Sequence, residues 1–140
     1  MRSAAFQAFA VLTALALRAD ASPPGVSFAT LLEAETTILD QAFEYPEGNP
    51  KITALMLTVP PRATIALHKH PVPLFVYILK GSITVEYDGI GPVTYRRGDS
   101  FVEAFEWPHR AWNGGRGRAK LLTVYAGAAG TENSVLLPED

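Results

Sequence analysis

The chain has 140 residues, with 12 Lys and Arg against 14 Asp and Glu, a net charge of −2, three histidines and no cysteine. This charge balance leaves no basic surface for a nucleic acid or an anionic membrane. The lack of cysteine excludes disulfides and thiolate metal ligands. The length suits one hydrophobic core and is too short for two domains.

The first 21 residues have the three parts of a secretory signal peptide. Arg2 supplies the positive region, Ala4 to Leu17 form an apolar run, and Ala19-Asp20-Ala21 fits a small-x-small cleavage site before Ser22. The run is shorter than the roughly 20 residues of a transmembrane helix. We therefore expect cleavage and export to a bacterial periplasm or medium, with no membrane anchor and a remaining net charge near −3. The alternative is a cytosolic protein with an apolar N-terminal helix.

Residues 22–50 are expected to form an N-terminal arm and an edge strand. Phe28 to Glu35 suits one or two helical turns, and Thr36 to Leu39 suits the edge strand. Tyr45 to Pro50 is a turn by its Pro and Gly content.

Residues 51–127 have the pattern of β-strands, because apolar or alternating runs are separated by Pro and Gly turns. The expected strands are 52–59, 64–70, 74–79, 82–87, 93–96, 101–105, 110–113 and 121–125. About eight short strands with tight turns and no helix between them predict an all-β antiparallel sandwich or small barrel. Residues 128–140 form a small, polar tail in which Val135 to Leu137 can dock on a sheet edge.

All three histidines lie between positions 68 and 109. Imidazole is the commonest protein ligand for first-row metals, so this grouping predicts a metal site. His68 and His70 are two residues apart on an expected strand, which places both side chains on one face, about 6.6 Å apart along the chain. His109 alone would be an ordinary core or loop residue, and it gains weight only in combination with the other two.

The face shared by the first two histidines also carries Thr64 and Ala66, whose small side chains would leave room in front of the imidazoles. The opposite face carries the apolar residues Ile65 and Leu67. Alternation therefore leaves open whether the histidines face inward, and a pair of exposed edge histidines is the alternative.

Glu103 is the other candidate for chemistry. It shares a strand face with Phe101 and Phe105. If the two phenylalanines are buried, so is the carboxylate, and a nearby metal or histidine would offset the cost of burying it. In the alternative, Val102 and Ala104 face the core and Glu103 is solvated.

Five aromatic residues are candidates for the walls of a pocket that takes a flat or apolar organic ligand, namely Phe75, Tyr77, Phe101, Trp107 and Trp112. Trp107 and Trp112 flank His109 and are the strongest candidates. The alternative is that the aromatic side chains only fill a barrel core.

This pattern resembles the cupin superfamily, in particular its small single-domain bacterial members of the type-2 group. The first motif of the superfamily, G-x5-H-x-H-x3,4-E-x6-G, falls on Arg62, His68, His70, Leu74 and Gly81. The second motif, G-x5-P-x-G-x2-H-x3-N, falls on Gly98, Ala104, Glu106, His109 and Asn113. The resemblance implies a jelly-roll barrel, the cupin double-stranded β-helix, over residues 51–127. It also implies that His68, His70 and His109 are metal ligands.

Four positions depart from these motifs. Arg62 replaces the first Gly, which questions the turn geometry there, and Ala104 and Glu106 replace the Pro and Gly of the second motif, so that loop is expected to be reshaped. Leu74 replaces the Glu that would be the fourth ligand. Some cupin dioxygenases are similar in using three histidines without the carboxylate, which leaves metal positions open for substrate and dioxygen. Glu103 is a candidate to supply the missing carboxylate, as ligand or as general base.

The favoured hypothesis is a metal-dependent enzyme, dioxygenase-like, that acts on a small organic substrate and uses Glu103 to take a proton. Three histidines suit Fe, Mn, Ni, Cu, Co and Zn alike. Isomerase or lyase chemistry with the same residues is a variant. A non-catalytic periplasmic cupin that binds a metal or small ligand is the alternative, and a structural barrel without metal is a third hypothesis. The habit of the family and the apolar run 52–59 also suggest a homodimer.

Overall fold

The computed structural model describes residues 24–139, so the expected signal peptide at residues 1–21 lies outside the described residues. Within residues 24–139 the chain forms nine strands and no helix. The strands are β1 (Pro50–Val59), β2 (Thr64–Lys69), β3 (Leu74–Lys80), β4 (Ser82–Tyr87), β5 (Gly91–Arg96), β6 (Ser100–Val102), β7 (His109–Trp112), β8 (Ala119–Ala128) and β9 (Val135–Leu136). Among these described residues no helix has the length and hydropathy to span a membrane.

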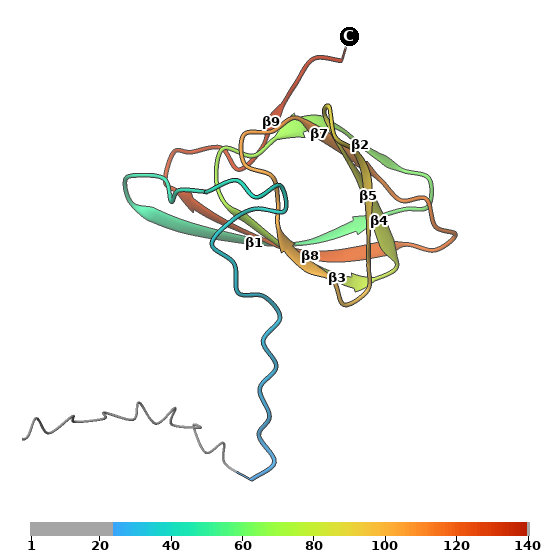
Figure 1. The fold of residues 1–140 in the computed structure, drawn as a ribbon, viewed down its shortest axis with the longest axis horizontal. Helices are drawn as coiled ribbons and strands as arrows, with labels where there is room; N and C mark the ends of the chain where they lie inside the picture. Colours follow the sequence, from blue (N-terminus) through green and yellow to red (C-terminus); the bar gives the residue numbers. More distant parts are fainter. Residues whose placement is uncertain (1–23, 140) are drawn as a thin grey trace, which may run out of the picture.

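The strands build two antiparallel sheets that enclose a common interior (Figure 1). One sheet has the order β1-β8-β3-β6 and the other has the order β5-β4-β7-β2-β9. Strands that are neighbours in a sheet are often far apart in the sequence, as β1 and β8 are, which is typical of a jelly roll. The predicted all-β jelly-roll fold is therefore confirmed.

The interior is filled by the inward-facing half of each strand. In β4 the buried residues Ile83, Val85 and Tyr87 alternate with partly exposed polar ones, as the period of two requires. The facing sheet contributes a similar set from β3, in which Leu74 and Val76 are buried. Burial of these apolar side chains from both sheets is the main force that holds the barrel together.

A bulge in β2 decides where the histidines point. Ile65 pairs with Ala111 of β7, whereas His68 pairs with His109, so β2 has one residue more than β7 between the two pairs. The extra residue is a β-bulge, and it reverses the alternation of side chains. Ile65 and His68 consequently face the interior together. The expectation that Thr64 and Ala66 share the face of the histidines is wrong, since both are exposed.

The N-terminal arm is extended and lies against the end of β6. Phe28 to Glu35 contains no helix, and Thr36 makes a single β-bridge with Ala42 in place of an edge strand. The short segment buries too few apolar side chains to stabilise a helix. Three hydrogen bonds help to fix the arm instead. Ile38 N–H donates to Val102 O, the Gln41 side-chain amide donates to Phe105 O, and Phe105 N–H donates to the amide oxygen of Gln41.

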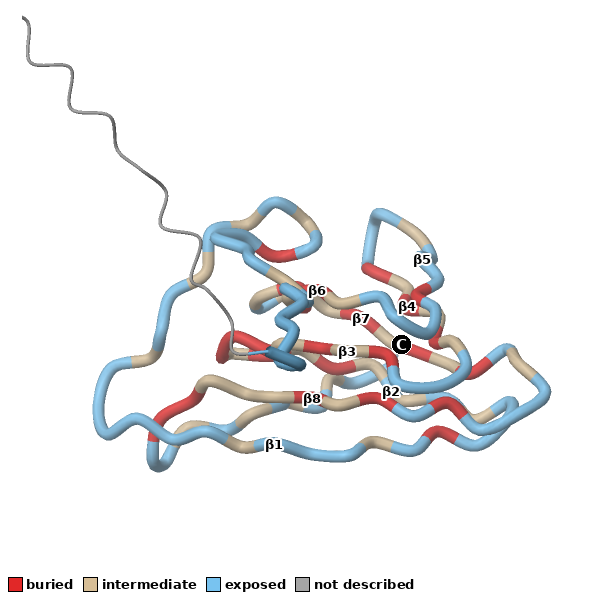
Figure 2. Tube along the Cα trace, turned by 90° about the horizontal axis from the view of Figure 1, so that it is seen from below, coloured by how far each residue is buried: buried red, intermediate tan, exposed pale blue. Residues whose placement is uncertain are grey.

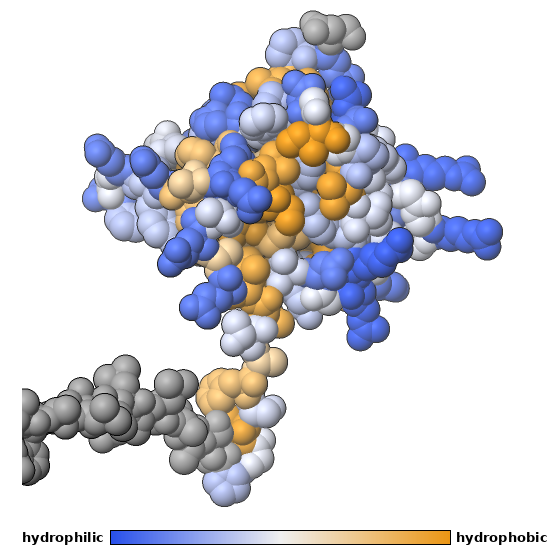
Figure 3. All heavy atoms as spheres, in the orientation of Figure 1, coloured by the Kyte–Doolittle hydropathy of each residue, from blue (hydrophilic) through white to orange (hydrophobic). Residues whose placement is uncertain are grey.

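The surface distributes polar and apolar side chains unevenly. On the face seen in Figure 3, hydrophilic side chains project around much of the periphery, while hydrophobic side chains gather toward the middle and along the arm. Strand β1 is the edge of its sheet and is exposed along most of its length (Figure 2). It exposes Ile52 and Met56, which have no cover from the described part of the chain.

Candidate metal centre

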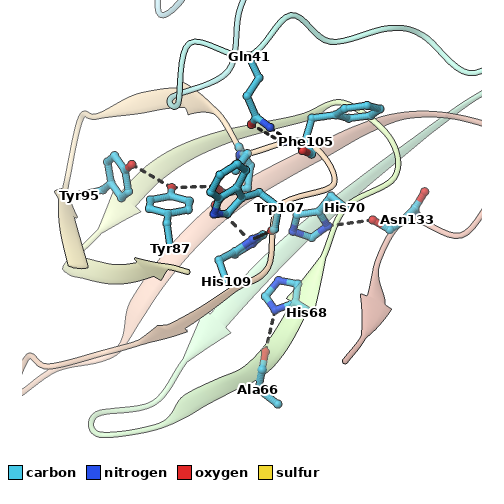
Figure 4. Close-up of polar contacts among 12 residues, drawn as sticks. Gln41, Ala66, His68, His70, Tyr87, Tyr95, Phe105, Trp107, His109 and Asn133 are labelled. Atoms are coloured by element: carbon cyan, nitrogen blue, oxygen red, sulfur yellow. Dashed lines mark hydrogen bonds and ion pairs between the residues drawn. The ribbon is translucent and has the colours of Figure 1, made fainter. Parts of the chain in front are cut away.

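The three histidines meet inside the barrel. His68 lies in β2, His70 follows the end of that strand, and His109 begins β7 and pairs directly with His68. Their ring centroids are 4.4–5.0 Å apart, and the rings point toward one another (Figure 4). All three side chains are buried. The alternative of exposed edge histidines is therefore excluded by their burial.

Backbone carbonyls fix the tautomer of each ring. The Nδ1 atoms of His68, His70 and His109 lie 2.7, 2.9 and 2.8 Å from the carbonyl oxygens of Ala66, Asn133 and Trp107. A carbonyl oxygen only accepts hydrogen bonds, so each Nδ1 carries the proton and each Nε2 keeps a free lone pair. Metal-binding histidines are commonly oriented by such contacts.

The donor set fits a divalent transition metal. One nitrogen from each histidine lies within 4.8 Å of those of the other two. Metal–nitrogen bonds are about 2.0–2.1 Å long, so small rotations of the side chains would bring three nitrogens onto one ion. Burial lowers the pKa of all three histidines, that of His70 to about 3. The imidazoles are therefore neutral near pH 7, which is the form that binds a metal.

Glu103 stands beside this cluster. Its N–H donates to Leu74 O at 2.8 Å, so the two residues are cross-strand neighbours at the junction of β3 and β6. The carboxylate is buried, and its Oε2 lies 3.9 Å from Nε2 of His109. Glu103 is thus buried on the same side as Phe101, and the alternative of a solvated carboxylate is wrong. The carboxylate comes from the residue that follows β6, the strand next to the one that carries Leu74.

Two tyrosines that the sequence analysis passed over support the carboxylate. Tyr87 donates from its hydroxyl to Oε1 of Glu103 at 2.7 Å, and the Tyr95 hydroxyl lies 3.0 Å from that of Tyr87. The N–H of Ala104 also donates to Oε1, at 2.8 Å. Burial nevertheless raises the pKa of Glu103, because these contacts only partly offset the loss of water. Burial likewise raises the pKa of Tyr87, and that of Tyr95 to about 12.

A cavity of about 240 Å³ opens in front of the histidines. It is lined by Leu57, Ile65, His68, His70, Leu74, Val76, Ile83, Val85, Phe101, Glu103, His109, Ala111, Leu121, Thr123, Tyr125, Ser134 and Leu136. Ser134 and Leu136 are exposed, so they border its mouth. A larger groove of about 740 Å³ lies elsewhere and is lined by none of the histidines.

The cavity wall corrects the expected set of pocket aromatics. Phe101 lines the cavity, but Phe75, Tyr77, Trp107 and Trp112 do not. Phe75 and Tyr77 alternate with inward-facing Leu74 and Val76 and therefore face outward. Trp107 donates from its indole to Asp88 O, and Trp112 alternates with inward-facing Ala111. Tyr125 is the aromatic residue that the sequence analysis left out of the pocket, and its ring lies 5.7 Å from that of His70.

Arg62 and Glu106 stand where the two cupin motifs have glycine, and the chain still turns at both positions. Both residues have positive φ angles, 63° and 53°, a conformation that glycine adopts at little cost. The backbone of each is tied down, since Arg62 N–H donates to Asn113 O and Glu106 N–H donates to His70 O. Glu106 also forms an ion pair with Lys69. The turn at Arg62 keeps a glycine-like geometry, contrary to the doubt raised from the sequence.

Comparisons with known proteins match the chain to one family and to several solved structures. The family model described as Cupin domain matches residues 55–125, half of the chain. No curated protein matches the sequence. Among solved structures, the chain is similar to the oxalate decarboxylase of Lactobacillus farciminis in its formate complex, with a TM-score of 0.54 and 21% identity over 61% of this chain and 26% of that one.

Two further solved structures share the fold. The DMSP lyase DddQ from Ruegeria pomeroyi has a TM-score of 0.53 and 22% identity over 61% of this chain and 42% of that one. A structure concerned with the Mn(II) centres of Bacillus subtilis oxalate decarboxylase has a TM-score of 0.53 and 21% identity over 71% of this chain and 31% of that one. The chain thus spans less than half the length of each of these three proteins. The three-histidine cluster supports a divalent transition metal without specifying which. The chain belongs to the cupin family.

Proposed function

We propose that this cupin is a metal-dependent enzyme acting on a small organic substrate, with His68, His70 and His109 as metal ligands and Glu103 as the group that takes a proton. The observation that carries the proposal is the position of Glu103. Its Oε2 lies 3.9 Å from His109 Nε2 and faces the same cavity, yet the carboxylate stands outside the three-histidine cluster. A bound divalent metal would supply Lewis acidity and, if it is iron, a site for dioxygen.

The neutral histidines favour an anionic ligand. Three uncharged imidazoles leave the double charge of a metal uncompensated, so a substrate with anionic oxygen atoms would gain most from binding there. Glu103 is the acidic side chain in the described cavity wall, and burial raises its pKa toward the range in which a carboxylate can both accept and release a proton. Tyr87 holds that carboxylate in place by donating to Oε1.

We propose dioxygenase chemistry as the first form of this activity. The metal cluster contains no carboxylate among the described residues, so positions on the ion would be free for two small ligands. A non-oxidative lyase or isomerase reaction is the second form. It is favoured by the placement of Glu103, because proton transfer by a carboxylate needs no oxidant.

The test is to load the metal-free protein with Fe(II) or Zn(II) and to screen β-diketones, catechols and 2-oxo acids. Oxygen consumption is followed with an electrode, and substrate C–H exchange is followed by NMR in D2O. Oxygen consumption with Fe(II) supports the dioxygenase, and exchange with Zn(II) under nitrogen supports the lyase or isomerase. Glu103→Gln should abolish both signals and keep the metal, whereas Glu86→Gln, on the outer surface, should retain them. Binding with neither signal would leave a non-catalytic binding protein.

We also propose that the protein is exported after cleavage near Ala21. The support is the three-part pattern of residues 1–21. Expression in a bacterial host, fractionation and N-terminal sequencing test it. A mature chain that begins at Ser22 in the periplasmic fraction is expected, and an intact Met1 in the cytosol would refute it.

A further inference from the structure

We infer that the cavity takes small metal-chelating monoanions with a compact apolar tail, and that it rejects ligands with a second charge in the tail. This inference rests on the proposed function, because the metal would hold the head group. The argument comes from how the strand registers distribute polar and apolar side chains along the cavity.

The polar side chains occupy one layer of the barrel. In one sheet Tyr87 pairs with His109, which pairs with His68. In the other sheet Leu74 pairs with Tyr125 and is the cross-strand neighbour of Glu103. The histidines and the carboxylate are therefore gathered at one end of the cavity, and the Tyr87 hydroxyl contacts the carboxylate.

The next layer is apolar on both sheets apart from Thr123. Val85 pairs with Ala111, and Ala111 pairs with Ile65. On the facing sheet Val76 pairs with Phe101 and with Thr123, and all of these line the cavity. Thr123 is the polar side chain of this layer, and its hydroxyl has protein partners, since it lies 3.4 Å from the carbonyl oxygen of Leu55 and also contacts Tyr125.

The layer beyond is apolar as well. Leu121 pairs with Leu57 of β1, and both line the cavity together with Ile83. Among the described residues that line the cavity there is no lysine or arginine. A ligand whose head is at the histidines would extend its tail into these layers, where an apolar tail gains by leaving water and a second carboxylate would lose its hydration without a partner.

The volume limits the size of the ligand. The cavity has a volume of about 240 Å³. Pockets for drug-sized ligands span about 300–1,000 Å³. The cavity therefore suits a compact ligand, such as a bidentate oxygen head group with a short aliphatic chain or a single ring.

Hydroxamates that share one bidentate head test this inference without turnover. The protein is loaded with Co(II), and its visible absorption is titrated with acetohydroxamate, pentanohydroxamate and the monohydroxamate of succinic acid. Pentanohydroxamate has three more methylenes than acetohydroxamate, so it should bind about fifty-fold more tightly if each is fully buried. The succinic compound, of similar length but with a carboxylate tail, should bind no more tightly than acetohydroxamate.

A change of charge in the apolar part of the cavity wall should reverse the preference. Leu57→Lys places an ammonium group beside the tail, and it should tighten binding of the succinic compound relative to pentanohydroxamate. Met56→Lys is the matched control, because Met56 is exposed and does not line the cavity, and it should keep the wild-type order. If Leu57→Lys does not fold, the affinities of the wild-type protein for the three hydroxamates still test the inference.

The outcomes separate the two proposals. Equal affinities for the three hydroxamates, or tightest binding of the carboxylate tail to the wild type, would overturn the inference and leave the proposed function standing. If Co(II) is bound but no hydroxamate alters its spectrum, the ion has no accessible position, and the proposed function fails together with the inference.

Discussion

Glu103→Gln should stabilise the metal-free protein at alkaline pH and leave it unchanged at acid pH. The substitution removes the charge but keeps an oxygen that can accept from Tyr87 and from the N–H of Ala104, the two donors that contact Oε1 at 2.7 and 2.8 Å. The other carboxylate oxygen faces Nε2 of His109 at 3.9 Å, and that nitrogen has no proton to donate when Nδ1 carries it.

The sign follows from the direction of the pKa shift. Burial raises the pKa of Glu103 in the folded protein above its ordinary value of 4.5. The contribution of a group with a raised pKa is fully present below its unfolded pKa and is lost as the pH rises through its folded pKa. At a pH above the folded-state pKa, each pKa unit by which the folded-state value exceeds the unfolded-state value lowers the free energy of unfolding by about 1.4 kcal/mol. One kcal/mol moves the melting temperature of a domain of about 100 residues by roughly 4–8 °C.

Thermal unfolding of the chelator-treated proteins between pH 4 and pH 9 measures this difference. The histidine pKa shifts are common to both proteins and largely cancel in it. Glu86→Gln is the matched control, because Glu86 is partly exposed and its ion pair with Arg110 lies on the outer surface, so its difference from wild type should be small at every pH. A Glu103→Gln difference that does not change with pH, or a wild type that is the more stable protein at pH 8, would show that the buried carboxylate charge does not destabilise the fold.

Three other predictions follow from the same contacts. His109→Ala should abolish metal binding, measured by elemental analysis and by loss of the metal-induced rise in melting temperature, while circular dichroism keeps its β-sheet signal; full metal occupancy would exclude His109 as a ligand. Tyr87→Phe removes a donor to Glu103, so it should keep the metal but slow substrate proton exchange about tenfold or more, and an unchanged rate would mean that the hydroxyl positions nothing. If β1 is the edge of a homodimer, Ile52→Lys with Met56→Lys should convert a dimer into a monomer in light scattering, and a monomeric wild type would contradict this.

The architecture could be predicted because it depends on local signals. The alternation in residues 82–87 and the Gly and Pro turns give the strands directly, and apolar burial then requires two sheets. The metal site could also be predicted, because all three histidines of the chain lie within residues 68–109. The N-terminal arm was misjudged at Phe28 to Glu35, because a short segment without buried partners has no strong conformational signal of its own.

The orientation of the residues in β2 could not be predicted, because a bulge leaves no mark in the alternation itself. The extra residue between Ile65 and His68 is visible only against the register with β7. The role of Glu103 was open for a similar reason. Its neighbour Leu74 lies on another strand, and cross-strand pairs between β3 and β6 depend on the register of the sheet.

The pocket residues were predicted least well, because residue type was given more weight than strand phase. Phe75 and Tyr77 are large and aromatic, but they face outward, whereas the smaller Leu74 and Val76 form the wall. The sequence shows that Leu74 and Val76 lie on one face of β3 and that Phe75 and Tyr77 lie on the other. Both faces are apolar, so the alternation does not tell which one is buried. Only the opposing sheet determines which phase is the inner one.

Elemental analysis of the untagged wild type and of the His68→Ala variant, both purified without chelator from cells grown with mixed metals, shows whether the three histidines bind a metal. We expect about one equivalent of a divalent transition metal per wild-type chain and none in the folded variant. Wild-type protein that holds no metal even after reconstitution, or a variant that keeps full occupancy, would contradict the assignment of the three histidines as a metal centre.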